Sequence, residues 1–227
     1  MTGTEKNNMP FRIKDCTLIA RMAGLREALN LRELEERINI CPVECLFHHF
    51  CETVIRPTFD DPDYPNDFAL WAGHQLQDEI LAEQLANINP YKFNSLDELR
   101  KTVLDIIQER LSELDFIPWA PNGNGFHFMQ AVTVVYDTGI EIDSVEDFYD
   151  QLPQMSLGSI YYHFVEARRR TEFGIDDFSL WLSDKDEQVQ PLIKALSEID
   201  FYFLTLSQLR QTLIDTVSAF TSGEAHA

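Results

Sequence analysis

Hydrophobic and polar residues follow the same order twice along this chain. Each pass opens with a stretch rich in apolar and β-branched residues, which predicts a β-strand over residues 11–22 and another over 126–136. The first strand is expected to end at Gly24 and the second at the turn-forming residues 137–139. Because a single strand leaves its backbone groups unpaired, we expect the two strands to pair with each other.

Helical periodicity follows each strand in the same series of segments. A short helix is predicted behind the N-cap residues Asn30 and Ser144, whose side chains can accept hydrogen bonds from the first helical turn. Next come a helix that carries a repeated histidine and a long helical segment, which ends near residue 88 in the first pass and 199 in the second. An amphipathic helix with a repeated Leu-x-x-Leu-Arg motif closes each pass.

The repeated residues keep a common register. His-x-x-Glu occurs at residues 49–52 and again at 163–166, a spacing of 163 − 49 = 114. Trp71 and Trp181 match at 181 − 71 = 110, because a loop in the second pass is four residues shorter. We therefore predict an α+β protein, mainly α, built by internal duplication of a strand–helix–helix–helix–helix unit. The two units are expected to be related by a pseudo-two-fold axis and to share a small sheet.

The duplication also sets the predicted domain boundaries. Residues 10–111 form repeat unit 1 and residues 126–220 form repeat unit 2, packed into one globular body. The Pro, Gly and Asn content of residues 112–125 is typical of a linker. The polar ends of the chain, residues 1–9 and 221–227, are predicted to be disordered.

One face of each histidine helix carries polar residues in a repeated order. At 100° per residue, His49, Glu52 and Arg56 lie on the side opposite the apolar residues. The same triplet recurs in the second pass, as His163, Glu166 and Arg170. A solvated face needs only polar residues, whereas here the same three residue types return at the same spacing. We take these six residues as the candidate functional site.

Two roles for this site do not involve a metal. In the first, the glutamates pair with arginines and orient the histidines within the fold, so that Glu52 and Glu166 act alike. In the second, the arginines bind an anionic or polyhydroxylated ligand as forked donors. Trp71 and Trp181 would then form an apolar wall of the ligand site.

A third role is metal binding by His49, Glu52, His163 and Glu166, a set that suits zinc, manganese or iron. Four-helix di-metal proteins use a related Glu-x-x-His pair on each of two helices. Here the order is reversed, and further carboxylates would have to come from Asp67 and Asp177. Those two residues otherwise stabilise the first turn of a helix. No cofactor is firmly indicated, and a divalent metal is the one left open.

The net charge of the chain disfavours some classes of binding partner. Lys and Arg number 18 against 38 Asp and Glu, a net charge of 18 − 38 = −20. This charge repels phosphate backbones and anionic lipid, which disfavours nucleic acid and membrane surfaces as partners. A small molecule or another protein remains. The chain has no apolar run of about 20 residues and no hydrophobic signal core, so we expect a cytoplasmic protein.

Four cysteines fall in the first half of the chain, at positions 16, 41, 45 and 51. Their counterparts in the second pass are apolar or small, namely Ala131, Met155, Ser159 and Val165. This exchange predicts buried, reduced and unbridged thiols. The C-x3-C-x5-C spacing leaves a structural zinc site as the alternative.

Three motifs in duplicate carry a resemblance to a known family: His-His-Phe or Tyr-His-Phe, then Asn-Asp-Phe or Asp-Asp-Phe with a nearby Trp, then Leu-x-x-Leu-Arg. The chain resembles an uncharacterised prokaryotic domain-of-unknown-function family over most of residues 10–218. The resemblance implies a soluble prokaryotic protein and transfers no activity. We expect a small-molecule-binding or regulatory module, with a metal-dependent enzyme or a purely structural protein-interaction module as alternatives. Whether the chain is an enzyme stays open.

Overall fold

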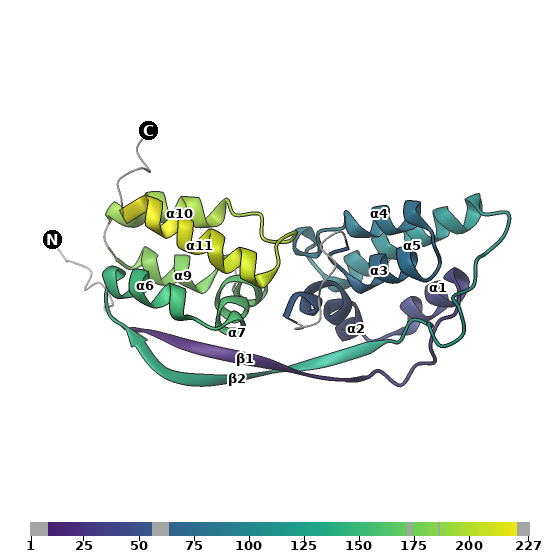
Figure 1. Cartoon of the computed structure of the whole chain (residues 1–227), viewed down its shortest axis with the longest axis horizontal. Helices are drawn as coiled ribbons and strands as arrows, with labels where there is room; N and C mark the ends of the chain where they lie inside the picture. The colour runs from purple at the N-terminus through teal and green to yellow at the C-terminus, as the bar shows by residue number, and fades with distance from the viewer. Residues whose placement is uncertain (1–8, 56–63, 172–173, 186, 222–227) are drawn as a thin grey trace. The chain divides into compact units, whose positions relative to one another are not determined.

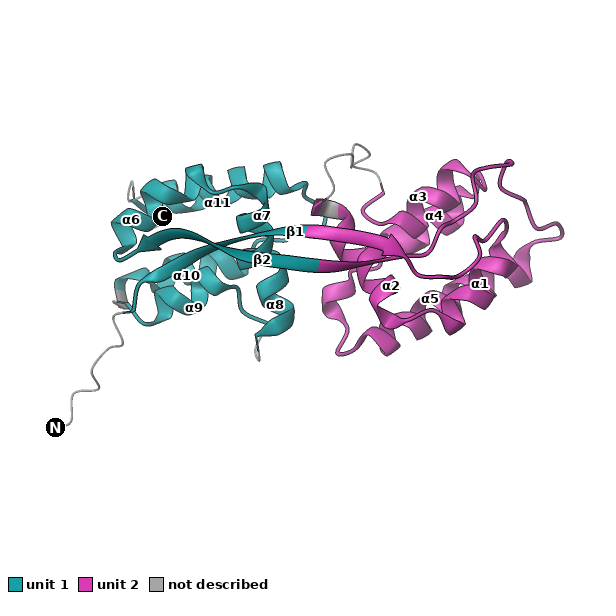
Figure 2. Ribbon diagram, turned by 90° about the horizontal axis from the view of Figure 1, so that it is seen from below, with its two compact units in different colours: residues 1–17, 133–227 teal, residues 18–132 magenta. Residues whose placement is uncertain are grey.

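A computed structural model describes residues 9–55, 64–171, 174–185 and 187–221. The chain divides into two compact units (Figure 2). Unit 1 combines residues 1–17 with 133–227, and unit 2 is residues 18–132. The predicted disordered ends lie almost entirely outside the described residues.

The sheet of the described residues has two antiparallel strands, β1 (Phe11–Met22) and β2 (Met129–Ile142) (Figure 1). The predicted pairing of the two strands is thus confirmed. Each strand contributes residues to both units, and within each unit the helices lie on one face of the ribbon (Figures 1 and 2).

The helices of unit 2 are α1 (Leu31–Ile40), α2 (Val43–Phe47), α3 (Asp67–His74), α4 (Glu79–Ala86) and α5 (Leu96–Glu113), with a π-helix η1 (His48–Glu52) and the 3₁₀ turns η2 (Thr53–Ile55) and η3 (Pro90–Lys92). Those of unit 1 are α6 (Val145–Gln151), α7 (Leu157–Ile160), α8 (Ala167–Arg170), α9 (Asp177–Ser183), α10 (Gln190–Ser197) and α11 (Leu206–Thr221), with a π-helix η5 (Tyr161–Glu166) and the 3₁₀ turns η4 (Leu152–Gln154) and η6 (Glu187–Val189). The predicted class, mainly helical α+β, is confirmed.

The predicted N-caps are in place. Asn30 accepts the N–H of Glu33 at the start of α1. Ser144 accepts the N–H of Asp147, whose carboxylate accepts the N–H of Ser144 in return, which completes a capping box on α6.

Two predicted elements differ from the structure. The second strand continues through residues 137–139 to Ile142, because pairing with β1 is kept across the expected turn: Thr138 donates to the carbonyl of Ile13 and Gly139 adopts a φ of +75°. The long helical segment of the first pass is two helices, α3 and α4. It breaks at Gln77, whose φ is +55°, immediately before the N-cap Asp78.

The strands are exchanged between the predicted repeats. Phe11, at the start of the first repeat, is buried in unit 1 against Phe178 and Trp181 of the second. Phe126, at the start of the second repeat, is buried in unit 2 and stacks on Phe68 of the first. The compact units therefore do not have the boundaries of the sequence repeats, because each contains the helices of one repeat and the strand start of the other.

The predicted linker is packed within unit 2. Ala120 donates its N–H to the carbonyl of Leu29, and Trp119 forms an antiparallel bridge with Asn30. Residues 112–125 thus connect the closing helix α5 to β2 while lying against the start of α1.

Candidate functional site

Each histidine helix contains a π-helical turn. Helix α2 runs directly into η1, and α7 runs through η5 into α8. Backbone hydrogen bonds from residue i to i+5 place more residues in each turn than the 3.6 of an α-helix. The 100° spacing used for the sequence therefore assigns the faces wrongly. His48, His49 and Glu52 are all buried, although the pattern placed His49 and Glu52 on the side opposite the apolar residues.

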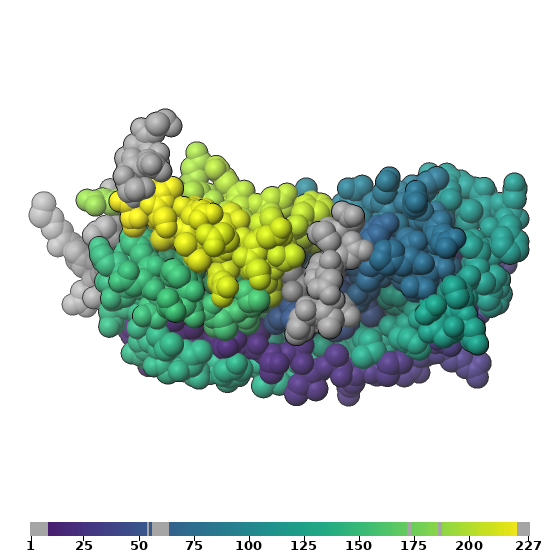
Figure 3. Space-filling model, viewed as in Figure 1, coloured from purple at the N-terminus to yellow at the C-terminus, as the bar shows by residue number. Residues whose placement is uncertain are grey.

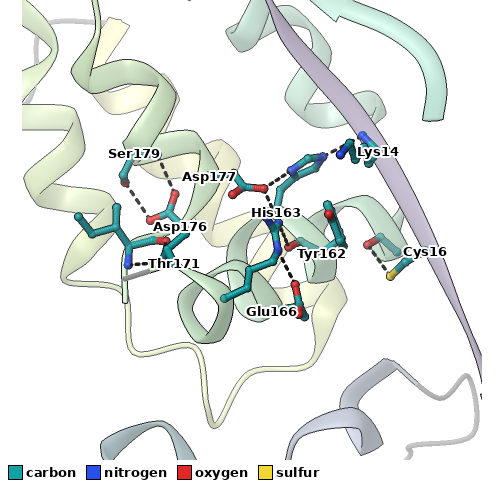
Figure 4. Close-up of polar contacts among 12 residues, drawn as sticks. Lys14, Cys16, Tyr162, His163, Glu166, Thr171, Asp176, Asp177 and Ser179 are labelled. Carbon is teal, nitrogen blue, oxygen red and sulfur yellow. Dashed lines mark hydrogen bonds and ion pairs between the residues drawn. The ribbon is translucent and has the colours of Figure 1, made fainter. Parts of the chain in front are cut away.

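In unit 1, His163 joins the strand to a helix (Figure 4). The backbone N–H of Lys14 on β1 donates to Nε2 of His163 over 2.8 Å. On the other side of the ring, Nδ1 lies 2.6 Å from a carboxylate oxygen of Asp177, the first residue of α9. His163 is 2% exposed, so both contacts form in a buried environment.

The same contacts recur in unit 2. The N–H of Met129 on β2 donates to Nε2 of His49 over 2.9 Å, and Nδ1 of His49 lies 2.6 Å from Asp67 at the start of α3. The ring of His49 packs on Phe126 with a centroid distance of 4.8 Å. The ring of His163 packs on Phe11 at the same distance.

These contacts define the protonation of both rings. A backbone N–H can only donate, so Nε2 is the acceptor and the ring proton is on Nδ1, where it is donated to the aspartate. Neither ring presents an unoccupied nitrogen lone pair to a metal or a substrate. The arrangement resembles the histidine–carboxylate pairs of catalytic sites. Here, however, the second nitrogen binds the strand of the protein itself.

Arg170 extends the network of unit 1. It donates from Nη2 to Asp177 over 2.5 Å and from Nε to Glu166 over 2.6 Å. Burial alone would raise the pKa of Asp177, but the hydrogen bonds from His163 and Arg170 outweigh it and the pKa is lowered. Asp177 is therefore a carboxylate held in its charged form, which is unsuited to act as a general acid. Arg56, which matches Arg170 in the first predicted triplet, lies outside the described residues.

The two repeated glutamates form different contacts among the described residues. Glu52 is 3% exposed and accepts from Nδ1 of His48 at 2.9 Å. The residue that matches His48 in the second pass is Tyr162, so Glu166 has no such partner and instead pairs with Arg170 and Arg169. The contact between Glu52 and His48 therefore has no counterpart at Glu166.

The repeated tryptophans do not form an open wall. Trp71 is 6% exposed and donates its indole N–H to the carbonyl of Asn124, and Trp181 is 9% exposed and donates to the carbonyl of Met9. Met9 lies two residues before Phe11, and Asn124 lies two residues before Phe126. Each tryptophan therefore holds the chain that leads into the strand on which the neighbouring histidine also acts.

Several residues of this network were missed by sequence reasoning. Asp67 and Asp177 were assigned mainly to first-turn stabilisation, whereas they bind the histidines, and the N-caps are the preceding residues Asn66 and Asp176. Arg168 was not singled out, yet it is the partner of Asp176. The duplicated Asp-Phe pair was the signal available for the first two residues. No duplicated signal marked Arg168, because Val54 occupies its place in the first pass.

The thiols of the chain are buried and unbridged, as predicted. Within the described part of the chain, no three His, Cys, Asp or Glu side chains come together as a ligand set for a metal ion. Among the helices of the same residues, none combines the length and the apolar character that crossing a membrane requires.

A model of DUF5752, a family of unknown function, matches residues 8–218 of the chain. The chain belongs to this family. Its predicted membership of a domain-of-unknown-function family is thereby confirmed. The fold is similar to "The structure of OrfY from Thermoproteus tenax", with 30% sequence identity and a TM-score of 0.77 over 94% of this chain and 96% of that one. No curated protein matches the chain.

Proposed function

We propose that this member of DUF5752 is a protein-binding module that captures an extended segment of a partner protein along the β1–β2 ribbon. The observation that carries the proposal is the concentration of exposed apolar side chains on these two strands. Among the residues that the structure describes, fifteen large hydrophobic side chains are exposed, and seven of them lie on β1 or β2: Ile19, Met22, Val132, Val134, Val135, Tyr136 and Ile140. Side chains of both strands are at the surface in the space-filling view (Figure 3).

The strand edges favour an extended partner segment over a small molecule. In the described residues each strand has one strand neighbour, so the backbone groups along its other edge have no strand to pair with; of the backbone N–H groups, that of Lys14 and that of Met129 bind the histidines. A segment added at such an edge gains main-chain hydrogen bonds, and its alternate side chains cover apolar residues of the ribbon. Exposed valine, isoleucine and tyrosine are the residue types that stabilise cross-strand pairs.

The two other functions expected from the sequence have less support in the geometry. A metal-dependent enzyme would need the ring nitrogens of His49 and His163, and both nitrogens of each ring bind the protein itself. A small-molecule site walled by Trp71 and Trp181 would need exposed indole rings, whereas these are buried.

The test compares a ribbon variant with a matched control. Val134→Lys/Val135→Lys places charge on β2, and Leu180→Lys/Phe203→Lys replaces two exposed apolar residues that are not on the strands. Each protein is incubated with extract of its native host, cross-linked, and the partners are identified by mass spectrometry. We expect one partner that cross-links to β1 or β2, is captured by the wild type and the control, and is lost with the ribbon variant.

Three outcomes contradict the proposal. The ribbon variant and the wild type could capture the same proteins, or sedimentation could show that the ribbon joins two copies of this chain. Stoichiometric zinc, manganese or iron in the purified protein that disappears in His163→Gln would support the metal-dependent enzyme instead. Far-UV circular dichroism of both variants establishes that the fold is retained.

A further inference from the structure

Each histidine identifies the strand edge that the helices of its own unit already bind. In unit 1 the N–H of Lys14 on β1 donates to His163, and in unit 2 the N–H of Met129 on β2 donates to His49. In Figure 1, β1 is drawn between β2 and the helices of unit 1, which agrees with the first of these bonds. The edge that is left open is therefore that of β2 in unit 1 and that of β1 in unit 2.

The alternation of the backbone decides which N–H groups point to the open edge of β2. Neighbouring residues of a strand direct their backbone groups to opposite edges. The carbonyl of Phe128 accepts the N–H of Ala23, which follows β1, whereas the N–H of Met129 points to the outer edge. Counting in twos from Met129 places the N–H groups of Val135 and Asp137 on this same edge, but within unit 1.

The register of the ribbon is regular over this stretch. The hydroxyl of Tyr136 donates to Asp15 at 3.0 Å. Tyr136 is 136 − 128 = 8 residues from Phe128, and Asp15 is 23 − 15 = 8 residues from Ala23. Neither strand thus has an extra residue between the two contacts, so the alternation is kept along this part of β2.

The N–H groups of Val135 and Asp137 are available to a further strand. In the described parts of the chain, no loop, helix or side chain accepts a hydrogen bond from either. The exposed large hydrophobic residues of the ribbon follow the open edges. In unit 1 all of them are on β2, and in unit 2 all but Val132 are on β1: Val134, Val135, Tyr136 and Ile140 in unit 1, and Ile19 and Met22 in unit 2.

The open edge of β2 lies in an acidic stretch. Residues 133–150 contain six exposed carboxylates and no Lys or Arg: Asp137, Glu141, Asp143, Glu146, Asp147 and Asp150. On β1 in the same unit the cations are Arg12, which pairs with Glu141 at 2.8 Å, and Lys14, so carboxylates stay in excess. The open part of β1, residues 18–22, instead contains Arg21 and no carboxylate. A segment that adds to β2 is therefore favoured by positive charge, and one that adds to β1 by negative charge.

We propose that the partner segment adds as a third strand at the outer edge of β2, where it pairs with Val135 and Asp137, and that Lys or Arg residues flank its apolar core. The proposal rests on the capture of an extended segment along the ribbon, and it assigns to that segment one edge and one sign of charge. Main-chain hydrogen bonds hold the segment, the exposed valines and Tyr136 of β2 contact its alternate side chains, and its flanking cations face the carboxylates.

The probe is a fluorescent peptide in which alternating valine and threonine are flanked by lysines, and its control carries glutamates in place of the lysines. Fluorescence anisotropy with the full-length protein measures binding. We expect the lysine peptide to bind more tightly than the glutamate peptide. On binding, hydrogen–deuterium exchange should slow at the amides of Val135 and Asp137, because these become donors to the peptide backbone.

Two proline variants compare the open edges. Val135→Pro removes an outward N–H without removing a bond to β1, an orientation in which an edge strand tolerates proline. Ala20→Pro is the matched control, because Ala20 is 20 − 14 = 6 residues beyond Lys14 and points its N–H to the open edge of β1. Val135→Pro should weaken binding of the lysine peptide about tenfold or more, and Ala20→Pro should leave it unchanged.

Modified peptides keep the test independent of the folding of a variant. Lysine peptides N-methylated either at the valines or at the threonines have the same charge, and only one of the two alternate sets of amides can face β2. We expect one methylated peptide to lose binding and the other to keep it. Equal binding of both would show attraction by charge alone and would overturn the proposal.

Two further results separate this proposal from the one on which it rests. If the glutamate peptide binds as tightly as the lysine peptide, or Ala20→Pro weakens binding as much as Val135→Pro, the assigned edge and charge are wrong while capture by the ribbon stands. If neither peptide slows exchange at any amide of β1 or β2, the proposed capture fails together with the assigned edge.

Discussion

The two compact units bury the N-cap of the helix that follows their histidine, and they do so with different chemistry. In unit 2 the cap is Asn66, which accepts from the N–H of Ala69 and donates from its amide to the carbonyl of Leu85. In unit 1 the cap is Asp176, which accepts from the N–H of Ser179 but has no proton to donate as a carboxylate.

In unit 1 the side chain of Arg168 donates the hydrogen bond to a helix carbonyl that the cap residue Asp176 cannot donate. Its Nη2 lies 3.2 Å from the carbonyl of Leu196 and 3.4 Å from Asp176. Leu196 is the second-to-last residue of α10, as Leu85 is of α4, so one guanidinium in unit 1 bonds the carbonyl at the helix position that the asparagine amide bonds in unit 2. The residue that matches Arg168 in the first pass is Val54, at 168 − 54 = 114.

The comparison shows that a neutral cap and a buried ion pair can fill one structural position. Burial raises the pKa of Asp176, while Ser179 and Arg168 act in the opposite direction. Burial also lowers the pKa of Arg168. Each charge of the pair is held in place by the other, so the pair is sensitive to the loss of one member although it adds little net stability as a whole.

The largest change in the free energy of unfolding is expected when the Arg168–Asp176 ion pair of unit 1 is broken. Arg168→Val leaves Asp176 buried at 1% exposure without its cation, and should lower the free energy of unfolding by about 3–5 kcal/mol. Urea denaturation followed by circular dichroism measures the loss. A change below about 1 kcal/mol would contradict the assignment of Arg168 as the required partner.

The matched control transfers the unit 2 solution to unit 1. Asp176→Asn/Arg168→Val restores an asparagine cap and a valine at the matching positions, so the amide can donate to the carbonyl of Leu196. The double variant should be as stable as the wild type or more stable, by up to about 4 kcal/mol. A double variant no more stable than Arg168→Val would show that the two units are not interchangeable at this position.

A smaller difference is expected between the repeated glutamates. Glu52→Ala leaves the buried His48 without its carboxylate and should cost about 1–3 kcal/mol of unfolding free energy. Glu166→Ala removes a partly exposed contact to Arg170, which keeps its bond to Asp177, and should cost about 0–1 kcal/mol. Thermal melting of both single variants measures the contrast, and equal shifts would contradict it.

The smallest expected effect is the loss of unfolding free energy at acidic pH. The folded pKa of Asp177 is below its ordinary value of 3.8, so its contribution to stability is complete above pH 3.8 and is lost as the pH falls through the folded value. The unfolding free energy of the wild type should therefore fall more steeply below pH 3.8 than that of Asp177→Asn. Denaturation curves at a series of pH values test this, and parallel pH profiles would exclude the carboxylate as the cause.

Residue pattern alone predicted the secondary-structure content, the pairing of the strands and the caps at Asn30 and Ser144. These features depend on local chemistry, such as β-branched residues in a strand or a side chain that accepts from the first turn. The break between α3 and α4 was missed. It depends on a left-handed backbone at Gln77, a residue type without a strong preference for that conformation.

The contacts of the candidate site residues could not be predicted from the sequence. The spacing of His49 and His163 identified two residues that occupy matching buried positions. The partners could not be read from the helix, because a π-helical turn shifts the faces and because the backbone donors, Lys14 and Met129, come from the exchanged strands. The internal duplication stays a hypothesis, which the recurrence of these contacts supports.

The exchange of strands has a consequence for the order in which the chain is made. Unit 2 is continuous in sequence, so all of its described parts have been synthesised once residue 132 has left the ribosome. Unit 1 joins residues 9–17 to helices that end at residue 221, and the first of these segments must wait for almost the whole chain.

During that interval Phe11 and Ile13 have no helices of their own unit to cover them. Closing the chain over this distance makes the contacts of unit 1 much less local than those of unit 2, and contacts between distant residues form slowly. During synthesis from the N-terminus, unit 2 can therefore fold before unit 1. The half that carries the Arg168–Asp176 pair is the one completed last.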